Sequence, residues 1–304
     1  MGYGLLAHIN EVSEQPCAIT GANGDWAMSA PLDALKTLPL VDAAVSTRVA
    51  DRDEPVVFEM EWNRPIDITY AGLFKTSLWK TGRFRLEAFK TSARTALAFT
   101  TQHASGIDRL VLPGLYDPKT LRFGGENTVF GQLGAREFIR YPTNVHVVMP
   151  LISAQVLRWT LYGPSYRVTG SRYVTTETAY RIGYAWAGDS LQFERHVGGS
   201  AEGYRRGGKV TDLPGGGGVS VEPGRGRRTA FVDRAVNEAG DRDRIFDIMT
   251  FLDADRPAVW LPDTDSPFDN FRYGGLMQVL EDYQHKYLND LHSAGTISLG
   301  EVTT

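Results

Sequence analysis

The sequence predicts a mainly β protein: an antiparallel β-sandwich followed by a second β-rich domain that contains one amphipathic helix. Three observations support this fold class. Apolar and polar residues alternate in three runs between residues 56 and 89, which is the period of strands with one wet face. The same alternation returns at residues 153–162 and 180–186. One segment, near residues 241–254, instead repeats its apolar residues with the period of a helix.

The runs between residues 56 and 89 are predicted to form the centre of the first sandwich. In the first run Glu59 and Glu61 lie opposite the apolar side, and in the third run Arg83, Arg85 and Glu87 do so. Pro65 and the segment Lys80–Gly82 are expected to separate the runs into three strands. The predicted buried residues are Phe58, Met60, Ile66, Ile68, Phe84 and Leu86.

Shorter elements are expected on both sides of this centre. A helical turn is predicted at 34–40, and short strands at 45–50 and 108–112. A buried strand at 145–149 is expected to end at Pro150, and the strand at 153–162 is predicted to be the last of the first sandwich. The sequence predicts no role for residues 93–140.

Three segments of the chain are predicted as separate parts. Residues 1–25 form an N-terminal arm, 26–163 the sandwich, and 164–304 the C-terminal domain, with Gly163-Pro164 as the boundary. The apolar patch within residues 1–10 allows two interpretations. It either docks on a neighbouring molecule or forms a first strand.

The second half begins with an alternating run whose apolar side carries Tyr180, Ile182, Tyr184 and Trp186. The helix near 241–254 has Asn237 or Asp241 as a candidate N-terminal cap. Strands are predicted at 229–233, 259–261, 273–283 and 296–302. The apolar stripe of the helix is expected to face a sheet and consists of Ile245, Ile248, Met249 and Leu252.

Composition excludes several classes of protein. The formal net charge is −4, which gives no overall basis for nucleic-acid binding. Cys17 is the sole cysteine, so the chain holds no internal disulfide and no cysteine-based zinc site. No stretch reaches the ~18 apolar residues that a membrane span requires, and the N-terminus predicts no signal peptide.

No segment of the sequence matches a catalytic, nucleotide-binding or metal-binding motif in full. Gly215–Gly218 lacks the following Gly-Lys-Ser/Thr of a phosphate loop, and the six histidines form no HxH or HExxH pair. Oxygen ligands between Asp263 and Asn270 lack EF-hand spacing. Glu59 and Glu61 are carboxylates of a solvated strand face. We therefore expect no enzymatic activity, no cofactor and no metal site.

The segment from Gly198 to Gly226 is predicted to be an irregular, arginine-rich loop. Glycine loses much backbone entropy when it is ordered, so a partner is expected to hold this loop if it is ordered at all. An acidic protein face is the best candidate partner, and a solvated loop is the alternative. The candidate contact residues are Arg205, Arg206, Arg225, Arg227 and Arg228.

The segment Trp26–Leu35 resembles the "W…PLDNLL" opening of a family of tail proteins of long-tailed bacteriophages. Runs like Val56–Trp62, Ile66–Ser77, Phe84–Phe89 and Val156–Leu161 follow in that family and form a galactose-binding-like jelly roll. In the second half, "PAVWLPD" at 257–263 and "GLM" at 275–277 are similar to its C-terminal region.

The resemblance implies a structural subunit of a tail tip or baseplate, similar to distal tail proteins. Such a subunit would assemble into a ring with other copies of itself and contact neighbouring tail proteins, or link the tail tube to fibres. It would be made in the cytoplasm of the bacterial host and reside in the virion. The glycine-rich loop and residues 93–140 depart from the pattern of this family.

A second hypothesis is a carbohydrate-binding module that attaches to a glycan on the host surface. Jelly rolls and other β-sandwiches are common folds of sugar-binding domains. Exposed aromatic rings would then contact the sugar, and the candidates are Trp62, Trp79 and Trp186. A third hypothesis is an enzyme such as a glycan hydrolase.

Overall fold

The computed structural model describes most of the chain. The described residues are 4–21, 24–38, 40–79, 81–111, 143–169, 173–193, 201–205, 209–212, 219–222, 226–237, 239–252, 256–281, 283–284, 286–287 and 293–302. The prediction for Gly215–Gly218 and most of the segment 93–140 lie outside them. The proposed caps of the helix, Asn237 and Asp241, lie in elements whose side chains are not described there.

The chain forms two compact units, each built from separate stretches of sequence. The first unit contains residues 1–8, 192–263 and 273–303, and the second contains 9–191 and 264–272. The domain bounds predicted at 1–25, 26–163 and 164–304 stay a prediction. The compact units divide the chain at other positions.

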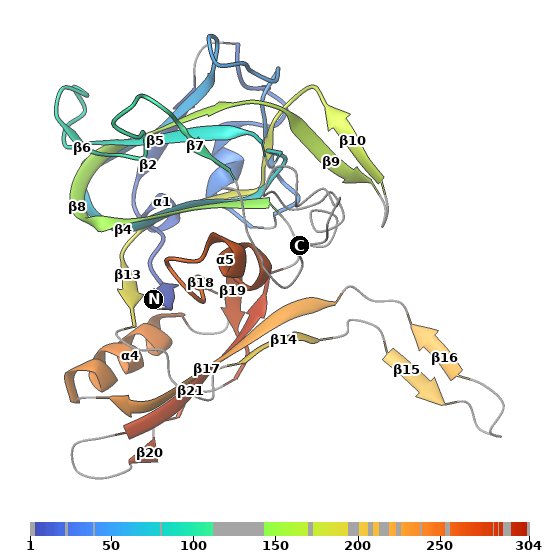
Figure 1. Cartoon of the computed structure of the whole chain (residues 1–304). Coiled ribbons are helices and arrows are strands. Elements are labelled where there is room, and N and C mark those ends of the chain that lie inside the picture. The colour runs from blue at the N-terminus through green and yellow to red at the C-terminus, as the bar shows by residue number, and fades with distance from the viewer. Residues whose placement is uncertain are drawn as a thin grey trace. The chain divides into compact units, whose positions relative to one another are not determined.

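The second unit is built on a seven-stranded antiparallel sheet (Figure 1). The strand order is β12-β4-β8-β5-β6, with β2 beside β4 and β7 beside β5. These strands are β2 (Cys17–Gly21), β4 (Val56–Thr76), β5 (Arg83–Phe89), β6 (Leu97–Thr100), β7 (Arg109–Leu110), β8 (Thr143–Tyr162) and β12 (Tyr184–Gly188).

Two predicted chain breaks are wrong, because β4 and β8 each continue through a proline. Pro65 lies inside β4 and Pro150 inside β8, and both are exposed. The pairing of β4 with β8 shifts register between Glu61 and Ile66, and again between Ile68 and Tyr70, opposite Pro150. A proline cannot donate to the ladder but fits at a bulge, so a bulge allows the strand to continue.

The core of the second unit matches the sequence prediction. Phe58, Met60, Ile68 and Leu86 are fully buried, as are Ile66 and Phe84 to within a few percent. The assignment of 153–162 to the last strand of the sandwich is wrong, because β12 pairs with Tyr70–Phe74 of β4 in the same sheet. Every residue of β12 is buried, which explains why its sequence is almost wholly apolar.

Smaller elements complete the second unit. The predicted turn at 34–40 is a 3-10 helix, η1 (Leu32–Lys36), and the strand predicted at 45–50 is β3 (Ala44–Val45), paired with β11 (Arg181–Ile182). The helix α5 was not predicted from the sequence. The remaining elements are α1 (Glu11–Glu14), β9 (Ser165–Thr169), β10 (Tyr173–Glu177) and α5 (Pro267–Tyr273).

The first unit is built on a second antiparallel sheet, of order β13-β1-β18-β19-β21-β17-β14, with β20 beside β21. Its strands are β1 (Leu5–Ala7), β13 (Ser190–Gln192), β14 (Ala201–Arg205), β17 (Arg227–Asn237), β18 (Pro257–Leu261), β19 (Gly275–Val279), β20 (Lys286–Tyr287) and β21 (Ser293–Glu301).

The N-terminal segment forms a strand in the chain's own sheet. Leu5 and Leu6 in β1 pair with Leu261 and Trp260 in β18 and are almost completely buried. Of the two interpretations of residues 1–10, the first strand is confirmed, and the arm ordered by neighbouring molecules is wrong for residues 5–7. The burial of this apolar patch within the chain removes its driving force for docking elsewhere.

The segment from 198 to 226 is less irregular than the sequence predicts. It contains β14 and an antiparallel pair of strands, β15 (Lys209–Asp212) and β16 (Val219–Glu222). All five residues of β14 are exposed, and β14 stands at the end of its sheet. The prediction of one long irregular loop is therefore wrong for residues 201–205, 209–212 and 219–222.

The predicted amphipathic helix is confirmed as α4 (Ala239–Leu252), two residues earlier than expected at each end. Ile245, Ile248, Met249 and Leu252 are buried, whereas Phe246 beside them is half exposed. The helix contacts β17, as expected for an apolar stripe that faces a sheet.

We expect Ile248→Pro to destabilise the protein by about 3 kcal/mol or more, because proline removes a hydrogen bond of α4 and its ring clashes with the preceding turn. Urea unfolding followed by circular dichroism measures the change. Asp247→Ala, at an exposed neighbouring position, is the control and should change stability by less than about 0.5 kcal/mol. Equal stability of the two variants would exclude a structural role for α4.

The predicted fold class is therefore confirmed: the protein is mainly β, its sheets are antiparallel, and it contains one longer helix. Among the described residues, no helix has the length and apolar character needed to cross a membrane.

Candidate functional site

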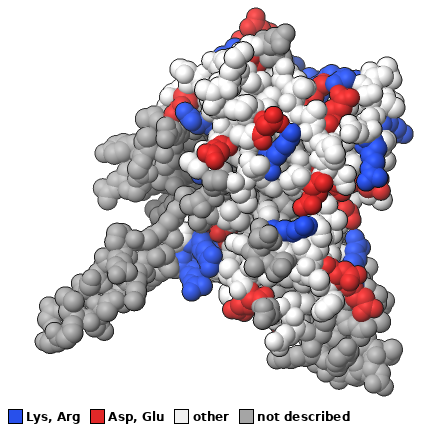
Figure 2. All heavy atoms as spheres, turned by 180° about the vertical axis from the view of Figure 1, so that it is seen from behind, with Lys and Arg blue, Asp and Glu red and all other residues white. Residues whose placement is uncertain are grey.

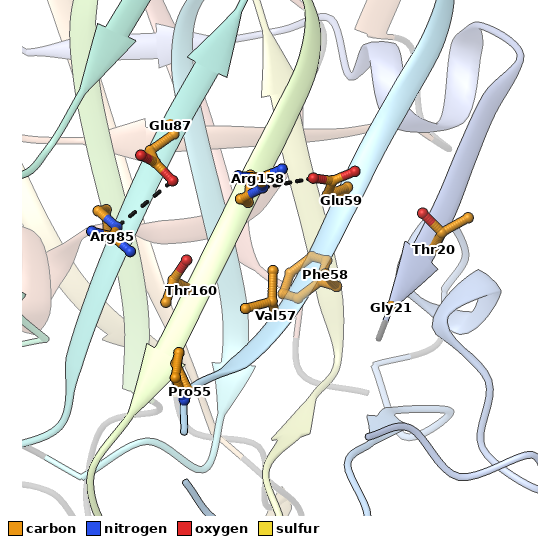
Figure 3. Close-up of a pocket in the computed structure, with 10 residues that line it drawn as sticks. All are labelled: Thr20, Gly21, Pro55, Val57, Phe58, Glu59, Arg85, Glu87, Arg158 and Thr160. Carbon is orange, nitrogen blue, oxygen red and sulfur yellow. Dashed lines mark hydrogen bonds and ion pairs between the residues drawn. The ribbon is translucent and has the colours of Figure 1, made fainter. Parts of the chain in front are cut away.

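A hollow of about 380 Å³ lies on the outer face of the large sheet of the second unit (Figure 3). Neighbouring strands place polar side chains in rows across this face. Glu59 of β4 lies opposite Arg158 of β8, which lies opposite Glu87 of β5. The hollow is lined by Thr20, Gly21, Pro55, Val57, Phe58, Glu59, Arg85, Glu87, Arg158 and Thr160.

The local sequence explains why these side chains share one face. Phe58 and Leu86 point into the core, so the residues on either side of them, including Glu59, Arg85 and Glu87, point outward. In β8 the buried neighbours Leu157 and Trp159 place Arg158 on the same outer face.

Glu59 is the most constrained carboxylate of the hollow. Its Oε1 atom lies 2.6 Å from Nε of Arg158, and its Oε2 atom lies 2.6 Å from a terminal nitrogen of Arg94. Arg94 also contacts Glu61 at 3.0 Å. Arg94 has a φ of 58°, a left-handed conformation that is uncommon outside glycine, and its side chain holds the loop after β5 against two carboxylates of β4.

The pKa of Glu59 reflects these contacts. Burial acts to raise it, but hydrogen bonds from Arg94 and Arg158 outweigh burial, so the pKa lies below its ordinary value of 4.5. A carboxyl group with a lowered pKa stays ionised at neutral pH, which suits a structural or ligand-orienting acceptor. A general acid requires the opposite shift.

We expect Glu59→Gln to destabilise the protein at neutral pH and to have little effect in acid. A carboxyl group whose pKa is lowered by folding stabilises the native state above its unfolded pKa, and this contribution is lost as the pH falls through the folded pKa. The difference in free energy of unfolding between the two proteins should therefore shrink below the ordinary pKa of 4.5. Urea unfolding across that range measures it, and a difference independent of pH would contradict the assignment.

Arg85 and Glu87 form a looser pair beside this network. Nε of Arg85 lies 3.7 Å from Oε2 of Glu87 and 3.9 Å from Oδ1 of Asp108. Both distances are too long for hydrogen bonds. Asp108 is itself anchored, because the hydroxyl of Tyr162 donates a 2.8 Å hydrogen bond to its other oxygen. Burial and this contact raise the pKa of Tyr162 to about 12, so the phenol remains a donor.

Charges of both signs alternate across the described part of the surface in Figure 2, and neither sign dominates. The hollow follows the same rule, with Arg85 and Arg158 balancing Glu59 and Glu87. A balanced face does not provide the positive field that nucleic-acid phosphates require.

The arginines predicted as partner contacts have different surroundings. Arg205 is exposed in β14 and lies opposite the half-buried Arg227 of β17. Arg228 is buried, with its guanidinium 2.6 Å from Glu301, so its charge is used within the fold. Arg206 and Arg225 lie outside the described residues.

The aromatic candidates for sugar stacking are mostly core residues. Trp62 and Trp186 are each 1% exposed, so neither ring reaches solvent, and the prediction is wrong for both. Trp79 is partly buried and packs against Tyr166 at 4.3 Å between ring centroids. His146 lies in β8, with its Nδ1 atom 2.7 Å from the hydroxyl oxygen of Tyr70.

The described residues contain no group of three or more His, Cys, Asp or Glu side chains that could hold a metal ion. Asp269 lies in the first turn of α5, and Asp263 and Asp265 precede that helix in the sequence. Cys17 is buried, and burial raises the pKa of its thiol to about 12, so it is a poor nucleophile.

Sequence reasoning placed Glu59, Arg85 and Glu87 on a solvated face but did not bring them together. It missed Arg94 as a contact residue, because the segment from 93 onward had no assigned role. The signal available was the outward alternation of charged residues in three separate strands. Their register across the sheet was needed to make one site.

Comparisons with known proteins give only distant structural likenesses. No protein-family model and no curated protein matches the chain. A fucose-binding module of Streptococcus pneumoniae is similar with a TM-score of 0.34 and 7% identity, over 59% of this chain and 94% of the module.

Two further solved structures are similar at the same level. The lectin domain of lectinolysin, complexed with Lewis B antigen, has a TM-score of 0.34 and 7% identity, over 60% of this chain and 96% of that domain. A family 32 carbohydrate-binding module from EndoD of Streptococcus pneumoniae has a TM-score of 0.31 and 11% identity, over 59% and 98%. Likenesses of this size do not assign a function to this chain.

Proposed function

We propose that this chain is a carbohydrate-binding protein that attaches to a surface glycan through the hollow on the large sheet of its second unit. The observation that carries the proposal is the set of two arginine–glutamate pairs in one open hollow, Arg158–Glu59 and Arg85–Glu87. Arginine and carboxylate groups present fixed forks of donors and acceptors, and sugar hydroxyls accept and donate in turn.

The rest of the lining supports a sugar ligand. Thr20 adds a hydroxyl at one side, and Pro55 and Val57 add apolar surface at another (Figure 3). A sugar ring has polar edges and apolar C–H faces, so a site with a few placed polar groups beside apolar surface fits it.

Binding without catalysis is the simpler proposal for these carboxylates. Glycoside hydrolysis needs one carboxylic acid with a raised pKa to protonate the leaving oxygen. Glu59 has a lowered pKa, and both of its oxygens already contact arginines. It therefore suits a structural role in the wall of the hollow rather than that of a catalytic acid.

The test is a glycan array probed with the purified full-length chain, followed by titration calorimetry with the glycans that are retained. We expect retention of at least one class of glycan, and its loss in Arg85→Ala. Arg205→Ala is the matched control, since Arg205 is exposed in the other unit and does not line the hollow. If the folded chain retains no glycan, or if Arg85→Ala binds as the unchanged protein does, the proposal is wrong.

The second candidate is a structural subunit of a bacteriophage tail tip or baseplate. It rests on the sequence resemblance, whose quoted segments contribute residues to β4, β5, β8, β18 and β19. Such a subunit would contact copies of itself and neighbouring tail proteins within the virion. The fully exposed strand β14 at the sheet edge offers backbone groups for such contacts.

Deletion of residues 205–226 separates the two candidates. A tail subunit that uses this segment should fail to enter particles, which mass spectrometry of purified virions would detect. A glycan-binding protein should keep its affinity, because the described residues of this segment do not line the hollow. Normal incorporation of the deleted chain would exclude this segment from assembly.

A further inference from the structure

We infer that the ligand of the hollow is an uncharged sugar ring with two adjacent hydroxyl groups, and that Arg85 and Glu87 are the residues that contact it. The inference rests on the proposed function and adds to it the chemical class of the ligand and the contacting pair. The Glu59–Arg158–Arg94 cluster then serves as the support of the site.

Unused hydrogen-bonding capacity singles out Arg85 and Glu87. Among the described residues, their side chains make contacts only at 3.7 and 3.9 Å, beyond hydrogen-bond range. The Nε atom of Arg85 is buried without a hydrogen-bond partner. The side chains of Arg85 and Glu87 are 27% and 19% exposed, so part of each reaches solvent. Donors and acceptors are thus available side by side.

Glu59 and Arg158 have much less unused hydrogen-bonding capacity. Each oxygen of Glu59 lies within 2.6 Å of an arginine nitrogen. The guanidinium of Arg158 also lies over the ring of Phe89, 5.2 Å from its centroid. These contacts fix Arg158 between Glu59 and Phe89, next to Glu87 in the same cross-strand row. Glu59 and Arg158 therefore stabilise the wall of the hollow and do not contact the ligand.

The charge of the lining determines which sugars fit. Two arginines and two glutamates line the hollow, so their formal charges cancel. An acidic sugar that approached Arg85 would lie close to Glu87, and the two carboxylates would repel each other. Two adjacent hydroxyls meet no such penalty, because each can accept from the guanidinium and donate to the carboxylate.

The experiment compares sugars that differ by one carboxyl group. Polymer conjugates of glucose, galactose and mannose are each paired with the conjugate of the corresponding uronic acid, and binding to the immobilised full-length chain is measured. We expect at least one neutral conjugate to bind about tenfold or more tightly than its uronate partner. Preference for a uronate, with binding still dependent on Arg85, would overturn this inference and leave the proposed function standing.

Substitutions test the contacting pair with the best neutral conjugate. Glu87→Gln keeps the shape of the side chain and should weaken binding about tenfold, since a charged acceptor is lost. Glu202→Gln is the matched control, because Glu202 is exposed in β14 of the other unit and does not line the hollow, and the affinity of this variant should be unchanged. Unchanged affinity in Glu87→Gln would also overturn the inference, whereas the absence of binding to every conjugate and array glycan would overturn the proposed function itself.

Discussion

Replacement of Trp159 by alanine is expected to lower the free energy of unfolding by about 3–5 kcal/mol, the range for large aromatic side chains in cores. Trp159 is fully buried at the centre of β8, opposite Phe58 of β4 and Leu86 of β5. Its ring stacks on Phe58 at 6.5 Å and packs against Phe84 at 6.0 Å between centroids. Alanine would leave a cavity that three strands cannot close without losing register.

The matched control is Trp159→Phe. The indole nitrogen of Trp159 is buried without a hydrogen-bond partner among the described residues, so phenylalanine loses no hydrogen bond there. We expect this variant to lose less than half as much stability as Trp159→Ala, because most of the stacked ring remains. Urea unfolding followed by circular dichroism measures both variants. A loss below about 1 kcal/mol in Trp159→Ala would show that the sheet collapses around the missing ring.

Residue periodicity predicted the core because it reports burial directly. Phe58 and Leu86 alternate with charged residues, and each such strand needs just one buried face to be recognised. The strand ends could not be predicted in the same way. Pro65 and Pro150 normally end strands, and here each lies at a shift of register between β4 and β8, which depends on the partner strand.

The candidate site could not be predicted because its residues lie far apart in the sequence. Glu59, Arg94 and Arg158 span a hundred residues of chain, and nothing local in any of them specifies the others. Cross-strand pairing brings Glu59 opposite Arg158, and the left-handed conformation of Arg94 completes the cluster. A charge on a wet strand face is usually solvated, so its use in a cluster becomes visible only with the register.

The sequence did not indicate which segments of the chain form each of the two units, for a similar reason. β1 lies at the start of the chain but pairs with β18, more than two hundred and fifty positions later. Gly163-Pro164 looked like a boundary because both residues favour turns, yet β12 returns to the same sheet after it. Turn chemistry marks where a strand ends and carries no information about which sheet the next strand joins.

Glu301→Ala is expected to destabilise the first unit by about 3–5 kcal/mol, because it removes a carboxylate that forms an ion pair with a buried arginine. Arg228 is 7% exposed, and a terminal nitrogen of its guanidinium lies 2.6 Å from Oε1 of Glu301. Oε2 of Glu301 accepts a 3.1 Å hydrogen bond from the backbone N–H of Arg228. Truncation removes both contacts, whereas the 2.8 Å hydrogen bond that the guanidinium donates to the carbonyl oxygen of Gly274 stays in place.

Two further variants identify the cause of that loss. Glu202→Ala removes an exposed carboxylate from β14, the strand beside β17, and should change stability by less than about 0.5 kcal/mol. The double variant Arg228→Met with Glu301→Leu should recover much of the loss, since a buried ion pair can be replaced by apolar side chains at little cost. Urea unfolding at low and high salt completes the test, because a buried pair is poorly screened. If Glu301→Ala behaved like Glu202→Ala, the Arg228 charge would have to be solvated in the folded protein, and Arg228 would again be available to a partner as the sequence suggested.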